Sequence, residues 1–190
     1  MEQQSENTGV DTTATPAANS KVWFITGASR GFGRIWTEAA LKRGDKVAAT
    51  ARNLESIADL KEQYGNNVLP LELDVTNHNQ AKAAVAQAHA HFGRLDIVLN
   101  NAGYSLVGTI EEAGADEVRA MYETNVFGPL AVIQAALPLL RKQGGGHILG
   151  TSSGLGHVTL PVIGYYCSSN GHSKPFMKVW PPKLPLSISK

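Results

Sequence analysis

Three closely spaced glycines, Gly27, Gly31 and Gly33, lie between an apolar run and a stretch with helical periodicity. Glycine lets a backbone turn tightly and lie against a ligand, because no Cβ stands in the way. The free N–H groups at the start of the following helix favour an anion at that position. Glycine-rich loops also occur for purely steric reasons. With that alternative open, the spacing predicts a turn within residues 21–44 that can contact a phosphate group.

The elements on either side of this turn must hold it in place. Residues 22–25 form a continuous apolar run, as expected of a parallel strand that is buried on both faces in the middle of a sheet. Beyond Gly33, apolar residues recur at intervals of three and four until Gly44. The residues that recur in this way are Phe32, Ile35, Trp36, Ala39 and Ala40.

Strand and helix patterns alternate along the rest of the chain. This alternation is typical of a doubly wound, Rossmann-like α/β fold with a parallel sheet and right-handed crossovers. A helical stretch at 117–142 contains Gly128-Pro129 and Pro138, so we expect it to bend. Five strands are recognisable, at 22–25, 46–51, 68–73, 95–99 and 147–152, and shorter helices are expected at 54–65 and 79–92.

The composition indicates a globular protein that acts on a small molecule. The 190 residues suit one domain, and the net charge of +1 gives no electrostatic reason to expect nucleic acid or an anionic membrane as a partner. A single cysteine, Cys167, excludes an internal disulfide framework and a cysteine-rich zinc site, and we predict no metal. Neither a membrane span nor a signal peptide is evident, so the cytoplasm is the expected compartment.

The two ends of the chain differ in amino-acid composition from the segment between them. Residues 1–20 are rich in Thr, Ala, Asn and Ser, and we expect a flexible leader. Residues 21–170 form the predicted nucleotide-binding domain. Residues 171–190 contain four prolines and four lysines and no acidic residue, and we expect an irregular tail without a continuous helix.

The loops that follow the strands are the places to look for a site, because ligands lie at the carboxyl ends of the strands in an open parallel sheet. Each of these loops offers a polar side chain or a glycine. They contain Ser29 and Arg30 after the first strand, Arg52 after the second, Asp74 and Val75 after the third, Asn101, Ala102 and Gly103 after the fourth, and Ser152 and Ser153 after the fifth.

Arg30 and Arg52 bear on the kind of nucleotide. In dinucleotide-binding folds an acidic residue at the end of the second strand accepts hydrogen bonds from the ribose, whereas an arginine pairs with a 2′-phosphate. Here that strand ends in Thr50-Ala51-Arg52, without a carboxylate. We therefore favour NADP over NAD as the cofactor. The alternative is that both arginines are ordinary solvated surface charges.

Several motifs together resemble the short-chain dehydrogenase/reductase family. Thr26-Gly27-x-x-x-Gly31-x-Gly33 resembles its cofactor signature, and Asn100-Asn101-Ala102-Gly103 resembles its motif after strand four. Ser153 and Tyr166, thirteen residues apart, resemble the family serine and tyrosine, and Asn125 matches its helix asparagine. These matches cover roughly residues 22–169.

The resemblance implies roles for the matched residues. Ser153 would polarise a carbonyl and Tyr166 would donate or remove the proton, while hydride passes to or from nicotinamide; Asn125 would support a water in the proton relay. Asp74 would hold the adenine amino group, unless it simply caps the next helix. The cofactor-binding residues implied are Thr26, Gly27, Ser29, Arg30, Gly31, Phe32, Gly33, Arg52, Asp74, Val75, Asn101, Ala102, Gly103 and Asn170.

Asn170 departs from the family pattern, which has a lysine four residues after the tyrosine. The two positions share one helix face, and a neighbouring ammonium stabilises a phenolate. Asparagine can hydrogen-bond a ribose hydroxyl but carries no charge. General acid–base catalysis contributes about 10² to 10⁴ in rate, so we expect a severe loss of activity.

The segment after Gly171 also departs from the family, whose members continue with two further strands and a segment that covers the substrate. Loss of one A from AAA-TGG would turn Lys-Trp into Asn170-Gly171, so we hypothesise a slip of the reading frame, which an intact frame on resequencing would disprove. The family forms homo-oligomers, and we expect that interface to be compromised. The chain is predicted to be an NADP-dependent oxidoreductase for carbonyl or alcohol substrates, with a non-catalytic nucleotide-binding module or an unstable fragment as alternatives.

Overall fold

The structure, a computed structural model, describes residues 20–178, with the backbone alone for 173–178. Its five strands form one parallel sheet in the order β3-β2-β1-β4-β5, which confirms the predicted Rossmann-like α/β fold and the central place of β1. Predicted and observed strand ends differ by no more than two residues. The elements are β1 (Val22–Ile25), α1 (Gly31–Lys42), β2 (Lys46–Ala51), η1 (Leu54–Ile57), α2 (Ala58–Tyr64), η2 (Gly65–Asn67), β3 (Val68–Glu72), α3 (His78–Phe92), β4 (Ile97–Asn100), α4 (Ala115–Tyr122), η3 (Glu123–Phe127), α5 (Gly128–Lys142), β5 (His147–Gly150), η4 (Gly154–Gly156) and α6 (Gly164–Lys178).

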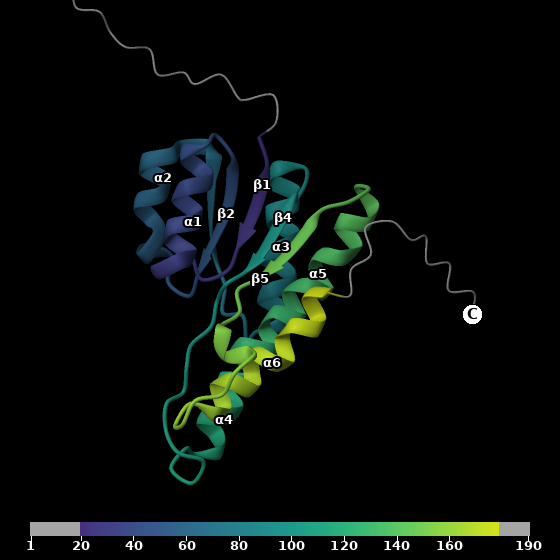
Figure 1. The fold of residues 1–190 in the computed structure, drawn as a ribbon. Coiled ribbons are helices and arrows are strands. Elements are labelled where there is room, and N and C mark those ends of the chain that lie inside the picture. Colours follow the sequence, from purple (N-terminus) through teal and green to yellow (C-terminus); the bar gives the residue numbers. More distant parts are fainter. Residues whose placement is uncertain (1–19, 179–190) are drawn as a thin grey trace, which may run out of the picture.

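Helices cover both faces of the sheet. The helices α1 and α2 lie on one face and α3 and α5 on the other, while α4 and α6 extend beyond one end of the strands (Figure 1). Each face has its own apolar core, since alternate strand residues point to opposite sides. Phe24 and Val98 belong to the core beneath α3 and α5, whereas Ile25 and Leu99 belong to the core beneath α1 and α2.

The buried face of α1 does not coincide with the apolar series that indicates the helix in the sequence. Gly33, Thr37, Ala40 and Leu41 are its buried residues, and Phe32 and Ile35 are 66% and 59% exposed. The apolar periodicity thus predicts the helix, whereas it does not identify the side chains that face the sheet. The reason is that small residues let α1 approach the strands closely, so the close contact at Gly33 decides which face turns inward.

The expected bend in the long helical stretch takes the form of a π-helical turn. Helix α4 passes into η3, where the N–H of Gly128 donates to the carbonyl oxygen of Glu123, five residues earlier. Pro129 follows and has no N–H to continue the regular ladder. Pro138 lies inside α5 without ending it. Short π-helical turns of this kind occur frequently at functional sites.

The expected irregular tail is wrong as far as residue 178, because α6 runs from Gly164 to Lys178 and includes Pro175. A proline removes one backbone hydrogen bond and bends a helix, but it does not have to end it. The remainder of the predicted tail, 179–190, and residues 1–19 of the predicted leader lie outside the described residues.

Asp45 ties the first βαβ unit together between the end of α1 and the start of β2. Its Oδ1 accepts a hydrogen bond of 2.9 Å from the N–H of Lys21, and its Oδ2 accepts one of 2.8 Å from the indole N–H of Trp23. The guanidinium of Arg43 also donates to Oδ2. Burial by itself raises the pKa of this carboxyl group, but the three donors outweigh burial and lower the pKa of Asp45 below its usual value.

Candidate functional site

A cavity of about 850 Å³ lies along the carboxyl ends of the strands, where the sequence predicts the site. It contains most of the predicted residues, including Tyr166, Asn125 and Asn170. Its lining also includes residues that the sequence reasoning gave no ligand role: Ala51, Leu73, Asn100, Tyr104, Thr124, Pro129, Gly150, Thr151, Ser152 and Ser169. The predicted residues along the lining are Gly27, Ser29, Arg30, Gly31, Phe32, Arg52, Asp74, Val75, Asn101, Ala102, Gly103, Asn125, Tyr166 and Asn170.

The glycine turn needs glycine at two of its positions for close packing. A Cβ on Gly33 would collide with the carbonyl oxygen of Gly27 and with the amide of Asn101, and a Cβ on Gly27 would lie 3.0 Å from the Cα of Ala102. Gly31 has a φ of +58°, and a Cβ there would meet no atom within 4 Å. The turn is therefore closely packed on its protein side and open at Gly31, where α1 begins.

Thr26 and Gly33 do not line the cavity, although both were predicted to bind the cofactor. The buried Thr26 Oγ1 accepts hydrogen bonds of 2.9 and 3.0 Å from the N–H groups of Asn101 and Ala102. The Asn101 side chain donates to the carbonyl oxygens of Thr26 and Gly27 at 3.0 and 3.2 Å. These contacts join the turn after β1 to the loop after β4, so Thr26 and Asn101 position the cavity wall.

Two arginines without an ion pair lie at the end of the cavity nearest β2. Arg30 and Arg52 both line the cavity and are exposed, and neither forms a salt bridge within residues 20–178. In contrast, Arg34 on the same helix is bound to Asp59 and Glu38, which raise its pKa. The cavity therefore carries available positive charge at this end.

Asp74 does not cap the next helix, so this alternative reading is wrong. Asn77 is the N-cap of α3 and accepts from the N–H groups of Asn79 and Gln80. Asp74 Oδ1 instead accepts from the N–H and the hydroxyl of Thr76, at 3.0 and 2.8 Å. This arrangement is an Asx turn that keeps the Asp74 side chain at the cavity rim.

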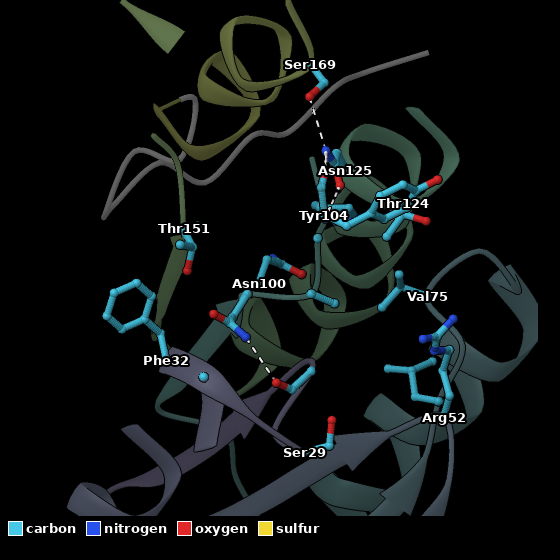
Figure 2. A pocket seen from close by; sticks show the side chains of 18 of the residues that line it. Ser29, Phe32, Arg52, Val75, Asn100, Tyr104, Thr124, Asn125, Thr151 and Ser169 are labelled. Atoms are coloured by element: carbon cyan, nitrogen blue, oxygen red, sulfur yellow. Dashed lines mark hydrogen bonds between the residues drawn. The ribbon is translucent and has the colours of Figure 1, made fainter. Parts of the chain in front are cut away.

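Asn125, in the π-helical turn, links three segments of the wall. Its Oδ1 accepts from the N–H of Tyr104 at 3.0 Å, and its Nδ2 donates to the carbonyl oxygen of Tyr104 at 2.8 Å. The same Nδ2 is 3.2 Å from the hydroxyl of Ser169 on α6. Figure 2 shows Asn125 between these two partners. The side chain thus holds the loop after β4 against α6.

Tyr166 and Asn170 lie one turn apart on α6 and both line the cavity. The Asn170 Nδ2 donates to the carbonyl oxygen of Tyr166 at 3.0 Å, and its Oδ1 lies 3.5 Å from the hydroxyl of Ser152. Ser153 does not line the cavity; its Oγ accepts from the N–H of Leu155 and caps η4. The structure therefore brings the tyrosine and Asn170 together at the cavity and turns Ser152 toward them.

Neither a metal site nor a membrane-crossing helix is found within residues 20–178. No cluster of three or more His, Cys, Asp or Glu side chains there has the arrangement of a metal site. None of the helices in the same range has the length and apolar character needed to cross a membrane.

The strand order, the glycine turn after β1 and the helices on both faces define a Rossmann-type α/β protein. A sequence model of the short chain dehydrogenase family matches residues 21–184, and the chain belongs to this family of oxidoreductases. The match extends beyond Ser169, where the predicted resemblance ended.

The chain spans little more than half the length of the first curated relatives that it matches. It is 44% identical over 151 residues to oxidoreductase BOA17 of Botryotinia fuckeliana, covering 79% of this chain and 55% of that protein. A short-chain dehydrogenase/reductase of Burkholderia phymatum, solved in complex with NAD, has a TM-score of 0.79 at 28% identity, covering 83% of this chain and 58% of that one. An alcohol dehydrogenase of Thermococcus sibiricus, complexed with 5-hydroxy-NADP, has a TM-score of 0.78 at 29% identity, covering 83% and 68%.

Proposed function

We propose that the cavity binds NADP(H), with the 2′-phosphate at Arg30 and Arg52. The observation that carries this proposal is the pair of arginines without ion pairs at the rim of a glycine turn. A bound 2′-phosphate would supply the anion that the surrounding protein does not. NADP is preferred over NAD on this argument, because no carboxylate follows β2 to accept from a ribose 2′-hydroxyl.

The residues present fit a dinucleotide. The turn is open at Gly31, and the first N–H groups of α1 are directed toward this opening, as pyrophosphate binding requires. Phe32, Val75 and Ala102 add apolar surface to the lining, and Asp74 and Asn101 add polar groups. When bound, the nicotinamide supplies or takes up a hydride.

The chain's own part in the reaction would be to bind the carbonyl or alcohol and to move a proton. Tyr166 would serve as acid or base at the cavity, and Ser153 would orient the carbonyl after a rotation of its hydroxyl away from Leu155. Asn125 would hold the wall around the proton relay. Asn170 occupies the place of the family lysine, and because it is neutral we propose that turnover is slow.

Asn170 also favours a second candidate function, a module that binds nucleotide without catalysing hydride transfer. The two functions share the cavity and differ in the chemistry beside Tyr166. The proposal also covers the partner, which is a small carbonyl or alcohol compound. We place the protein in the cytoplasm. We further propose that the interface of the family's homo-oligomer is impaired in this chain. The substrate itself is left unassigned.

A calorimetric titration of the full chain with NADPH and NADH tests the binding. We expect saturable NADPH binding at least tenfold tighter than NADH binding; absence of NADPH binding would refute both functions. Turnover of a broad panel of aldehydes and ketones then separates the two. Slow turnover that rises in the Asn170→Lys variant supports the oxidoreductase, whereas tight binding with no turnover in either protein supports the module.

A further inference from the structure

Val162 has a strained backbone. Among the described residues it is the only one other than glycine with a positive φ, at +57°. A β-branched residue is a genuine outlier in this left-handed region, where crowding by the Cβ lowers the population by a factor of roughly 5 to 30. Pro161 precedes it, and a left-handed residue after proline is typical of a type II turn, in which glycine or asparagine is usual. The surrounding structure must therefore hold Val162 in this conformation.

Two hydrogen bonds between separate segments of the chain hold it there. The carbonyl oxygen of Val162 accepts from the N–H of Gly108 at 2.7 Å. The hydroxyl of Tyr165, in the first turn of α6, donates to the carbonyl oxygen of Ile110 at 3.1 Å. These bonds form a bridge from the segment between β4 and α4 to the segment between η4 and α6, and the two segments lie side by side in Figure 1.

Little apolar burial supports this bridge between residues 104–113 and 157–163. Parts of a protein with few buried apolar contacts open locally at a low cost in free energy. Opening also releases the strain, since Val162 then returns to a conformation that valine favours. Five aliphatic side chains of the two segments are 51–64% exposed, namely Val107, Ile110, Val158, Leu160 and Val162.

Both segments continue directly from the wall of the large cavity. Gly103 and Tyr104 line the cavity where the first segment begins. Ser152, before η4, and Tyr166, in the first turn of α6, line it on either side of the second segment. A movement of the bridge therefore changes the cavity wall at the end that contains Tyr166.

We propose that the bridge between Gly108 and Val162 is a gate of the cavity. The gate is closed in this structure and opens when the backbone of Val162 relaxes, which admits and releases ligands beside Tyr166. The hydrogen bonds favour the closed state and the strained valine favours the open one, so the two states are in balance. The identity of the ligand, NADP(H), rests on the proposed function, whereas the opening itself does not.

Hydrogen exchange at the Gly108 amide of the full chain measures the opening without a ligand, because this N–H donates to Val162 across the bridge. Val162→Asn should slow this exchange by roughly 3- to 10-fold, since asparagine tolerates the left-handed region better than valine. Tyr165→Phe should have the opposite effect and speed the exchange by roughly 2- to 10-fold, the change expected for the loss of one hydrogen bond.

Val158→Asn is the matched control. It makes the same substitution in the same segment, at a residue that is 59% exposed and has no positive φ. The exchange rate of Gly108 should stay as it is in the unaltered chain. Equal slowing in Val158→Asn and Val162→Asn, or unchanged exchange in Val162→Asn, would overturn the proposal.

Stopped-flow mixing with NADPH tests passage through the gate. In Val162→Asn the association and dissociation rate constants should fall by the same factor, and the dissociation constant should stay within roughly twofold, because the closed state is favoured equally with and without ligand. Slower exchange with unchanged rate constants would show that the segments do not control entry, and the gate would be refuted. If the unaltered chain does not bind NADPH but its exchange responds as expected, the proposed function fails alone.

Discussion

Arg52 follows the last residue of β2 and lines the cavity, but it has no acidic partner within the described residues. A charge that is not already paired can bind an incoming phosphate without breaking an existing interaction. Hydrogen bonds to charged groups contribute about 1.5–3 kcal/mol. If the proposed function holds, the side chain at position 52 should therefore help to discriminate the phosphorylated from the unphosphorylated nucleotide.

Replacing Arg52 with alanine should weaken NADPH binding by roughly 10- to 100-fold and leave NADH binding nearly unchanged, because only NADPH carries the 2′-phosphate. Calorimetric titration measures both constants. Arg141→Ala, at the end of α5 and outside the cavity lining, serves as the control and should change neither. Equal losses for the two nucleotides would contradict the assignment.

Gly33 is closely packed and does not line the cavity. Because its Cβ would collide with Gly27 and Asn101, Gly33→Ala should push α1 away from the strands. Overpacking of this kind costs about 1–3 kcal/mol. Thermal unfolding should show a lower midpoint, and nucleotide binding should be lost. Gly154→Ala, where a Cβ would meet no atom within 4 Å, should behave like the unaltered protein.

The residue types and their spacing were enough to locate the cavity but not the direction of each side chain. The glycine turn could be predicted because close packing limits the residue type at Gly27 and Gly33. Ser152 and Ser153 are adjacent residues of the same type, and which of them faces the cavity depends on the cap that Ser153 makes at η4. The left-handed conformation of Val162 depends on a tertiary hydrogen bond and is not indicated by the residue type, because valine rarely adopts it.

At the scale of whole elements, the strands were easier to predict than the faces of the helices. An apolar run between polar residues defines a buried strand such as β2. The apolar residues of α1 surround much of the helix, so periodicity alone could not choose between Phe32 and Leu41 as the inward side chain. From the sequence, η3 could be predicted only as a bend. Pro129 indicates that the helical hydrogen-bond pattern is interrupted, but it does not indicate that the interruption is a π-helical turn.

The link made by Asp45 between β1, α1 and β2 gives the fold a pH dependence. Its pKa is lowered in the folded protein, so its stabilisation is fully present above the pKa of the unfolded chain, near 3.9, and is lost as the pH falls through the lower folded value. Asp45→Asn should lower the free energy of unfolding at pH 7 by about 1–3 kcal/mol, because three donors lose a charged acceptor that is itself buried.

Urea unfolding of both proteins between pH 7 and pH 2.5 measures this effect. The difference between the unaltered chain and Asp45→Asn should shrink as the medium becomes acidic. Asp59→Asn is the control, because the Asp59 carboxylate pairs with Arg34 at the surface, and surface pairs contribute little. A difference for Asp45→Asn that persists at pH 2.5 would show that packing and not charge holds this unit together.

At the scale of the whole molecule, β5 is the outer strand of the sheet on its side within the described residues. Its residues carry no Lys, Asp or Glu, and Leu149 is 44% exposed next to a groove lined by Trp23, Trp36 and Leu99. Natural proteins usually protect such edges with charge, proline or a bulge. The chain spans little more than half the length of the relatives it matches, and this edge lies on the side of the sheet where the described chain ends.

Leu149→Lys should therefore reduce self-association of the purified chain, since a charge on an edge strand disfavours pairing with another copy. Sedimentation velocity at several protein concentrations measures the change. Leu54→Lys is the matched control, because Leu54 is 42% exposed but lies in η1, away from this edge. If both variants associate equally, the edge has no special part in association.

The stacking of Trp36 on Phe32, with ring centroids 5.3 Å apart, has a practical consequence. Phe32 lines the cavity, while Trp36 lies one helical turn away outside it. We expect a compound that settles against Phe32 to change the surroundings of the Trp36 indole and so its emission. Intrinsic fluorescence should then report occupancy of the cavity without an added label.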